Sequence, residues 1–267
     1  MKFTHLKAVV GAMALSVAMV GTAQAQIVLA DITSETSDPG KVEIGVSTVA
    51  GGPHSTGKIG IWVPNLPTSP SKSFVDFDGL VPSSTAANAV VTINNPTGTI
   101  TDHSQFGRFD ITQVDSRDLY YGEWSQTADA SAGDHTVYYA GTGATTDAAA
   151  NALTGTAVNY NVRGVSDYAN NGQLSGAFTA NFVADTLTGS IQSNTYKLDI
   201  GTAGISGASF IGGDAVASAR AVSTDPFVAV ATDGIVSGHF FGSGAEALAG
   251  VALFANRQYD TAFGGSQ

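Results

Sequence analysis

Alternation of apolar and polar residues predicts short β-strands in the first third of the chain. Val42, Ile44 and Val46 alternate with charged or small neighbours, which is the period of a half-buried strand. Comparable runs occupy residues 58–63, 73–77, 89–93 and 109–114. Long loops rich in Pro and Gly separate these runs, and elaborate loops on a rigid scaffold commonly carry function. Residues 26–117 are therefore predicted to form a small β-rich ligand-binding domain.

From residue 118 onward the pattern predicts a longer antiparallel β-structure. Phe178, Ala180 and Phe182 share one face of a strand, while Thr179 and Asn181 share the other. Similar runs recur at residues 120–124, 135–140, 156–165, 186–192, 197–200, 206–212, 235–242, 250–255 and 260–264. Glycines inside these runs are typical of a sheet that bends sharply to close into a barrel. The polar outer face favours a water-soluble barrel over a membrane-spanning one, and the only helical stretch expected is 147–153.

The N-terminus is predicted to be a secretory signal peptide of residues 1–25. Lys2 and Lys7 precede an apolar run, and Ala23-Gln24-Ala25 fits the pattern of a cleavage site. The chain contains no Cys, so a lipid anchor on a cysteine is not expected at the new N-terminus. We therefore expect a secreted, non-lipidated protein that passes through the periplasm, with cell-surface association as an open alternative.

Composition narrows the classes of function further. With no Cys, the chain has no disulfides, no cysteine-ligated zinc and no thiol nucleophile. The formal net charge of −11 argues against nucleic-acid binding, because a basic surface is needed to neutralise phosphates. The sequence shows neither a nucleophile elbow between a strand and a helix nor a phosphate-binding loop, so we expect no enzymatic activity.

Several short segments of the second half resemble a known barrel. They are Tyr121-Gly122-Glu123-Trp124, His135 to Gly141, Gly176 to Phe182, Leu187 to Ile191, Gly238 to Gly242, Ala245 to Gly250 and Ala262 to Gly265. In this order they are similar to the eight-stranded barrel of the transferrin-binding protein B type, found in proteins exported by the Slam outer-membrane machinery. The resemblance covers residues 118–267 and implies that this segment is an export or handle domain.

A single barrel with a small N-terminal domain and no lipidated Cys resembles the hemophilin family of secreted haem-binding proteins. The resemblance implies an all-β, monomeric hemophore that binds haem b in residues 26–117. It also implies delivery of haem to a TonB-dependent outer-membrane receptor and export by Slam, with haemoglobin as a further candidate partner.

The choice of haem ligands is limited, because the predicted mature chain has no Cys or Met. His54 and His103 lie in N-terminal loops, and together they are predicted to be the two axial ligands of the haem iron. His135 and His239 lie in predicted barrel strands and are expected at the surface or an edge. Tyr120 stays open as an alternative ligand.

Haem also needs an apolar slot and cations for its propionates. Trp62 and Phe106 are candidates for the slot, and Lys58 and Arg108 are candidates for the propionates. Three alternatives remain: a zinc site at the two loop histidines, a module that captures a host protein such as haemoglobin without a small-molecule site, and an adhesin.

Overall fold

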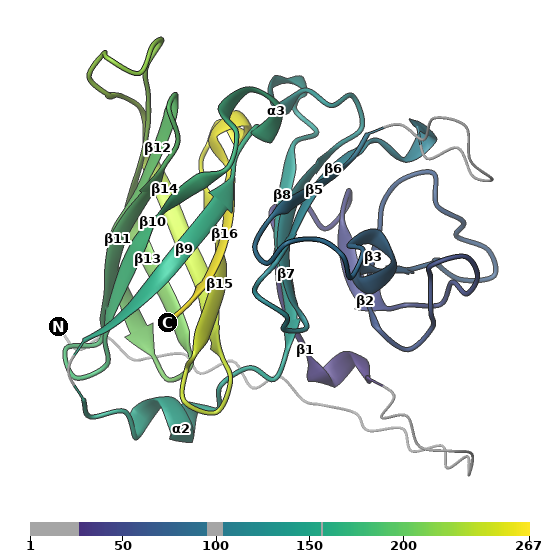
Figure 1. Cartoon of the computed structure of the whole chain (residues 1–267), viewed down its shortest axis with the longest axis horizontal. Helices are drawn as coiled ribbons and strands as arrows, with labels where there is room; N and C mark the ends of the chain where they lie inside the picture. Colours follow the sequence, from purple (N-terminus) through teal and green to yellow (C-terminus); the bar gives the residue numbers. More distant parts are fainter. Residues whose placement is uncertain (1–26, 95–103, 156) are drawn as a thin grey trace, which may run out of the picture.

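A computed structural model of the chain describes residues 27–94, 104–155 and 157–267. In Figure 1 a closed barrel stands at the left, a five-stranded sheet in the centre and a small three-stranded sheet at the right. The fold is nearly all β, as predicted, and the expected N-terminal sheet domain and closed eight-stranded antiparallel barrel are confirmed. No helix in these described ranges is long and apolar enough to cross a membrane.

The barrel contains strands β9 to β16, each hydrogen-bonded to its antiparallel neighbours, and β16 closes onto β9. The alternation of inward and outward side chains along each strand explains the closed barrel. The inward residues include four that are at most 2% exposed: Phe178, Phe210, Phe240 and Phe263. The strands are β9 (Val158–Val165), β10 (Leu174–Asn181), β11 (Thr186–Gln192), β12 (Tyr196–Ser206), β13 (Ser209–Ala219), β14 (Val228–Phe241), β15 (Ala247–Leu253) and β16 (Thr261–Ser266). Between them lie α3 (Tyr168–Asn171) and η4 (Arg257–Tyr259), and α2 (Asp147–Asn151) precedes β9.

The five-stranded sheet has the order β1-β8-β7-β6-β5. Its strands are β1 (Ile32–Thr36), β5 (Val90–Ile93), β6 (Arg108–Gln113), β7 (Leu119–Ser125) and β8 (Thr136–Thr142). The short helices η1 (Leu29–Asp31), η2 (Ser104–Phe106) and η3 (Ala130–Ala132) flank these strands. Here the structure corrects a prediction: β7 and β8 were assigned to the barrel, which begins only at β9.

The reason for this correction is burial on both faces of the sheet. Every residue of β7 is buried, with Tyr120 and Trp124 in the core of the N-terminal lobe and Leu119 and Tyr121 in the core shared with the barrel. Such a strand can belong to either neighbouring layer, because its sequence has no polar face.

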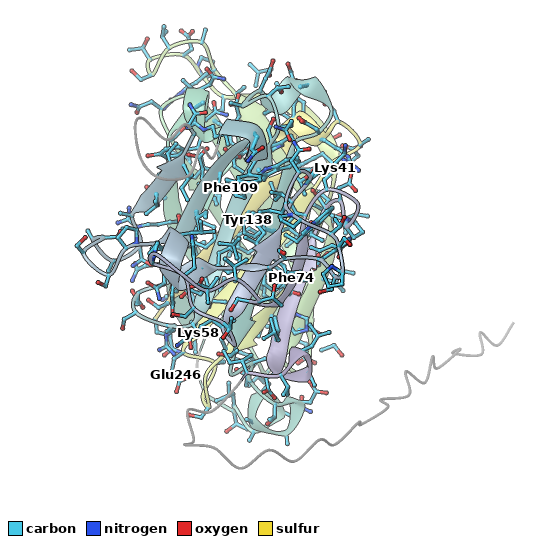
Figure 2. All side chains as sticks on the ribbon, turned by 90° about the vertical axis from the view of Figure 1, so that its right-hand side faces the viewer. Lys41, Lys58, Phe74, Phe109, Tyr138 and Glu246 are labelled. Atoms are coloured by element: carbon cyan, nitrogen blue, oxygen red, sulfur yellow. The ribbon has the colours of Figure 1, made fainter. Side chains whose placement is uncertain are left out.

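The third sheet covers the face of the central sheet that points away from the barrel. It has the order β2-β3-β4, from β2 (Glu43–Val46), β3 (Ile59–Trp62) and β4 (Val75–Asp76), and β4 leads directly into α1 (Phe77–Leu80). Phe77 stacks on Tyr120 with 4.9 Å between ring centroids. In Figure 2, Phe109 and Tyr138 lie near the centre of this lobe, and Lys58 lies toward its lower edge.

Candidate functional site

His54 lies in the loop that joins β2 to β3. The backbone N–H groups of Gly51 and His54 each donate to the other residue's carbonyl, both over 3.1 Å, so the loop folds back on itself. The neighbouring residues of the turn are exposed, whereas the imidazole is only 14% exposed. The turn therefore directs the imidazole inward from an otherwise exposed loop.

The inward partner of His54 is Asp76, whose side chain is fully buried at the N-terminus of α1. Imidazole Nδ1 lies 3.0 Å from Asp76 Oδ1, which also accepts from the backbone N–H of Ser55 over 3.1 Å. The other oxygen, Oδ2, accepts from the backbone N–H of Gly79 over 2.9 Å. A carboxylate oxygen acts as the acceptor here, so Nδ1 donates in this hydrogen bond and Nε2 is the ring nitrogen left for another partner.

Gly79 makes this close approach sterically feasible. A Cβ at this position would stand 2.3 Å from His54 Nδ1 and 2.9 Å from the carbonyl oxygen of Pro53. Only a glycine in α1 therefore lets the imidazole lie against the helix backbone. Asp76 and Gly79 were both missed by the sequence analysis, although an Asp that begins Asp-Phe-Asp-Gly-Leu is a recognisable helix cap.

Lys58, a predicted propionate partner, also meets α1. Its Nζ lies 3.5 Å from Asp78 Oδ2, and both side chains are more than 40% exposed. Lys58 further lines an open cavity of about 590 Å³ with Asp118 and Thr142. The structure thus brings two of the predicted site residues, His54 and Lys58, to one short helix.

Arg108, the second predicted propionate partner, has an internal partner instead. Its Nε and Nη2 donate to the two oxygens of Asp110 over 2.7 and 3.1 Å, and both side chains are largely buried. The hydrogen bond to Asp110 raises the pKa of Arg108. Its guanidinium therefore neutralises a buried carboxylate, which takes away the exposed cation that a propionate would need.

The predicted apolar residues lie at separate places in the lobe. Trp62 is 8% exposed, and the Lys72 ammonium stands 3.9 Å from the centroid of its ring. Phe106 packs at the margin of the N-terminal core, and its carbonyl accepts from Trp124 Nε1 over 2.7 Å. The predicted second ligand, His103, lies outside the described residues.

Of the two further histidines, His135 corrects the expectation of a position at the surface or an edge. His135 is 1% exposed and lies between Glu123 and the backbone of Arg257. His239 is partly buried where β14 faces the central sheet, and its Nδ1 lies 2.8 Å from the hydroxyl of Tyr139. Both side chains join the central sheet to the barrel.

Tyr120, the alternative iron ligand, is also part of the core. Its phenol is 1% exposed and donates to Asp78. Burial, and then the hydrogen bond to Asp78, raise the pKa of Tyr120 well above its usual value. A neutral, buried phenol does not offer the phenolate that ferric iron would take.

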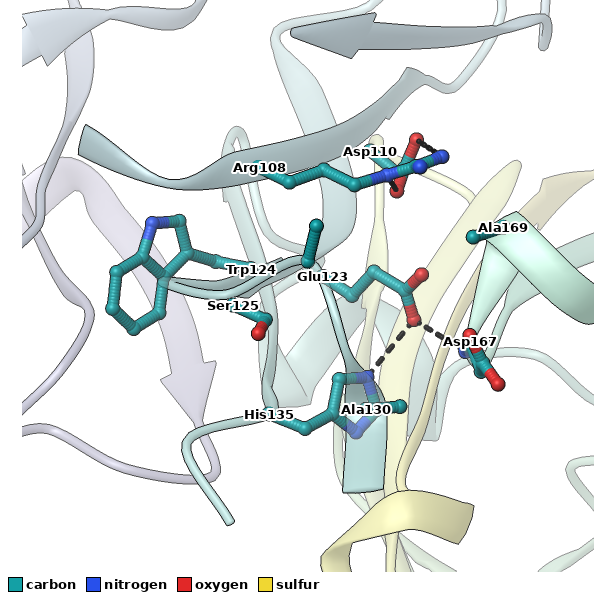
Figure 3. A pocket seen from close by; sticks show the side chains of 10 residues that line it. Arg108, Asp110, Glu123, Trp124, Ser125, Ala130, His135, Asp167 and Ala169 are labelled. Atoms are coloured by element: carbon teal, nitrogen blue, oxygen red, sulfur yellow. Dashed lines mark hydrogen bonds and ion pairs between the residues drawn. The ribbon is translucent and has the colours of Figure 1, made fainter. Parts of the chain in front are cut away.

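The small cavity in Figure 3 lies between Arg108, Glu123, His135 and Asp167. Its volume of about 20 Å³ holds a single water, so it is part of the lobe interface and too small for a cofactor. No group of three or more potential metal-ligating side chains occurs among the residues that the structure describes.

His54 has the chemistry of a haem ligand, because a porphyrin supplies four nitrogens and leaves only axial positions to the protein. Its Nδ1 is held by a carboxylate, as is usual for metal-bound histidines, and Gly79 leaves room for the imidazole. Among the described residues Nε2 has no hydrogen-bond partner.

Two family models match the chain. Residues 22–136 match the HphA N-terminal heme-binding domain, and residues 149–267 match the HphA C-terminal domain. The N-terminal domain of this chain is therefore a haem-binding domain of the HphA family, and the C-terminal domain belongs to the same family.

Two solved structures of HpuA share the fold. HpuA from Kingella denitrificans in complex with human haemoglobin gives a TM-score of 0.54 at 14% identity, over 92% of this chain and 89% of that one. The apo haemoglobin receptor HpuA gives 0.55 at 15% identity, over 91% and 90%. Transferrin-binding protein B from Neisseria meningitidis gives 0.44 at 15% identity, over 68% of this chain and 36% of that longer chain.

Proposed function

Since the chain belongs to the HphA family, we propose that it is a hemophore whose N-terminal lobe binds haem b through His54 Nε2. The observation that carries this proposal is the His54–Asp76 pair at α1, which fixes the imidazole while the surrounding loop stays exposed. The bound haem would be handed to a TonB-dependent outer-membrane receptor. His103 remains the second axial ligand predicted from the sequence.

The chain's own residues would perform two tasks. His54 presents a lone pair to the iron from an accessible loop. Lys58 is a half-exposed cation whose ion pair with Asp78 is long at 3.5 Å, so it can turn toward a propionate at small cost. Neither task requires the protein to transfer a proton or a covalent bond, in keeping with a carrier that is not an enzyme.

The barrel is proposed to serve export. Its resemblance to Slam-exported barrels supports this role, as does the signal-like segment 1–25, and the absence of Cys supports a released, non-lipidated protein. The receptor and the export machinery would meet different parts of the molecule, because the central sheet stands between α1 and the barrel.

Titration of the purified protein with hemin tests the proposal. The wild type should give one-to-one binding with a sharp Soret band and the visible bands of low-spin iron. His54→Ala should lose this spectrum, and His103→Ala should change it to that of a five-coordinate site. His239→Gln is the matched control and should bind hemin as the wild type does.

Two results would contradict the proposal. An unchanged spectrum in His54→Ala would remove His54 as the ligand. If the protein showed no hemin spectrum but captured haemoglobin, the alternative would be favoured: a receptor for a host protein, as the likeness to HpuA suggests.

A further inference from the structure

We infer that Asp76 is a positioning residue for the iron ligand: it fixes His54 in the tautomer with a bare Nε2 and makes that nitrogen a stronger donor to ferric haem. This inference rests on the proposed function. It concerns a residue two strands away from the histidine loop, at the junction of β4 and α1.

The first step is the hydrogen-bond arrangement around Asp76. Its carboxylate is fully buried and accepts from the backbone N–H groups of Ser55 and Gly79, so both oxygens are held in place. The oxygen that faces His54 therefore cannot rotate away without breaking a helix cap. The imidazole has one low-energy arrangement beside it, with Nδ1–H donating.

The second step is electronic. A carboxylate that accepts from Nδ1–H pushes electron density toward Nε2 and raises its basicity as a metal ligand. Such a hydrogen bond stabilises the more highly charged ferric state relative to the ferrous state, so it lowers the reduction potential of the haem. Asp76 would thus favour tight binding of the oxidised haem found outside cells.

The third step is steric. Gly79 lies against the same imidazole nitrogen, and a Cβ there would overlap it at 2.3 Å. Gly79→Ala would push the imidazole off Asp76 while leaving the carboxylate in place. Ala is a better helix former than Gly, so α1 itself gains from the change.

The variants for the test are Asp76→Asn, Gly79→Ala and the control Asp129→Asn, all in the full chain. Asp129 caps the one-turn helix η3 through the backbone N–H of Ser131, as Asp76 caps α1. The control therefore loses the same charge at the same kind of cap position, but it has no imidazole partner.

Three measurements follow. In the haem-free wild type, ¹⁵N NMR should show His54 protonated on Nδ1 only. Hemin titration should show roughly 10–100-fold weaker binding in Asp76→Asn and Gly79→Ala. The midpoint potential of the ferric–ferrous couple should move to more positive values in both, and stay at the wild-type value in Asp129→Asn.

The outcomes separate this inference from the proposed function. If His54→Ala loses haem but both Asp76→Asn and Gly79→Ala keep the wild-type potential, the inference fails and the carrier survives. The inference also fails if NMR shows the proton on Nε2, or if Asp129→Asn shifts the potential equally. Loss of fold in Asp76→Asn leaves Gly79→Ala and the NMR measurement to decide.

Discussion

Glu123 and His135 form a buried ion pair that fastens the central sheet to the barrel. His135 Nε2 lies 2.9 Å from Glu123 Oε2, and His135 Nδ1 lies 2.7 Å from the carbonyl oxygen of Arg257 in η4. Both ring nitrogens face acceptors, so the imidazole is held as a cation. The backbone N–H groups of Asp167 and Tyr168 donate to Glu123 over 2.7 and 2.6 Å. Figure 3 shows the Glu123 carboxylate between His135 and Asp167.

The variant Glu123→Gln should therefore be strongly destabilising. Each carboxylate oxygen accepts from a backbone N–H, so a Gln amide in either orientation turns its NH₂ against a donor. Breaking a buried pair by removing one partner costs about 3–5 kcal/mol. For a protein of this size, that loss lowers the Tm by roughly 6–20 °C.

The pKa of His135 gives an independent magnitude. Burial alone would lower it, but the hydrogen bond and charge of Glu123 outweigh burial and raise the pKa of His135 to about 9. Relative to the usual value of 6.5, this corresponds to about 3 kcal/mol. The free energy from the pKa of His135 and the cost expected for breaking a buried ion pair therefore agree in order of magnitude.

The pH dependence has a definite sign. Because the folded pKa of His135 is raised, its contribution to stability is complete below pH 6.5 and is lost as the pH rises through about 9. Burial alone would raise the pKa of Glu123, but His135 and the backbone amides outweigh burial and hold this pKa below its usual value, so its contribution is lost only in acid. The stability difference between wild type and Glu123→Gln should be largest near pH 5–6 and should shrink toward pH 10. Asp260, with a pKa raised by burial to about 6, is present in both proteins and largely cancels in the difference.

Urea unfolding at pH 6, 8 and 10, followed by tryptophan fluorescence and circular dichroism, measures this difference. Asp38→Asn is the matched control, because Asp38 makes a partly exposed ion pair with Arg257 at the same lobe interface. That pair should be worth at most about 1 kcal/mol. A Glu123→Gln variant within about 1 kcal/mol of the wild type, or a difference that is constant from pH 6 to 10, would refute the reasoning.

Two further substitutions probe the sheets on either side of this pair. Gly264→Val should cost about 1–3 kcal/mol in urea unfolding, because a Cβ at Gly264 would stand 2.7 Å from Tyr121 Cδ1 and 2.8 Å from Val114 Cγ2, where β16 packs on the central sheet. Tyr138→Phe should unfold at the same urea concentration as the wild type or a higher one, because its buried hydroxyl has no hydrogen-bond partner among the described residues. A large loss of stability in Tyr138→Phe, or none in Gly264→Val, would contradict these contacts.

The sequence predicted the fold best where one face of a strand is buried. In β10 the predicted inward residues Phe178 and Ala180 are fully buried, while Thr179 and Asn181 on the other face are partly exposed. Prediction failed at β7 and β8, since a strand buried on both faces does not indicate which layer it joins. The layer was decided by pairing with β6 and β1, which are separated from the barrel along the chain.

The candidate site was predictable in its residue types but not in its contacts. His54 could be chosen because few side chains in the predicted mature chain can bind iron. Asp76 could not be chosen, since it is 22 residues away and is brought to His54 only by the β3–β4 pairing. The partner of Arg108 could not be chosen for a different reason. Asp110 lies only two residues away on the same face of β6, but the sequence does not show that this face is buried and that the two side chains pair there.

The arrangement of the sheets separates the exposed loop that carries His54 from the packed cores of the protein. The core that surrounds Phe77 lies on one face of the central sheet, and the core that includes Tyr121 and Phe241 lies on the other. Residues 50–53, 55 and 56 are exposed, so opening this loop exposes little apolar surface. Its main cost is the loss of the hydrogen bonds that His54 and Ser55 make to Asp76. The Glu123–His135 pair and the barrel lie beyond the sheet and need not change when His54 gains or loses a ligand. For the proposed carrier, this separation would let the ligand leave by a local motion while the lobes stay joined.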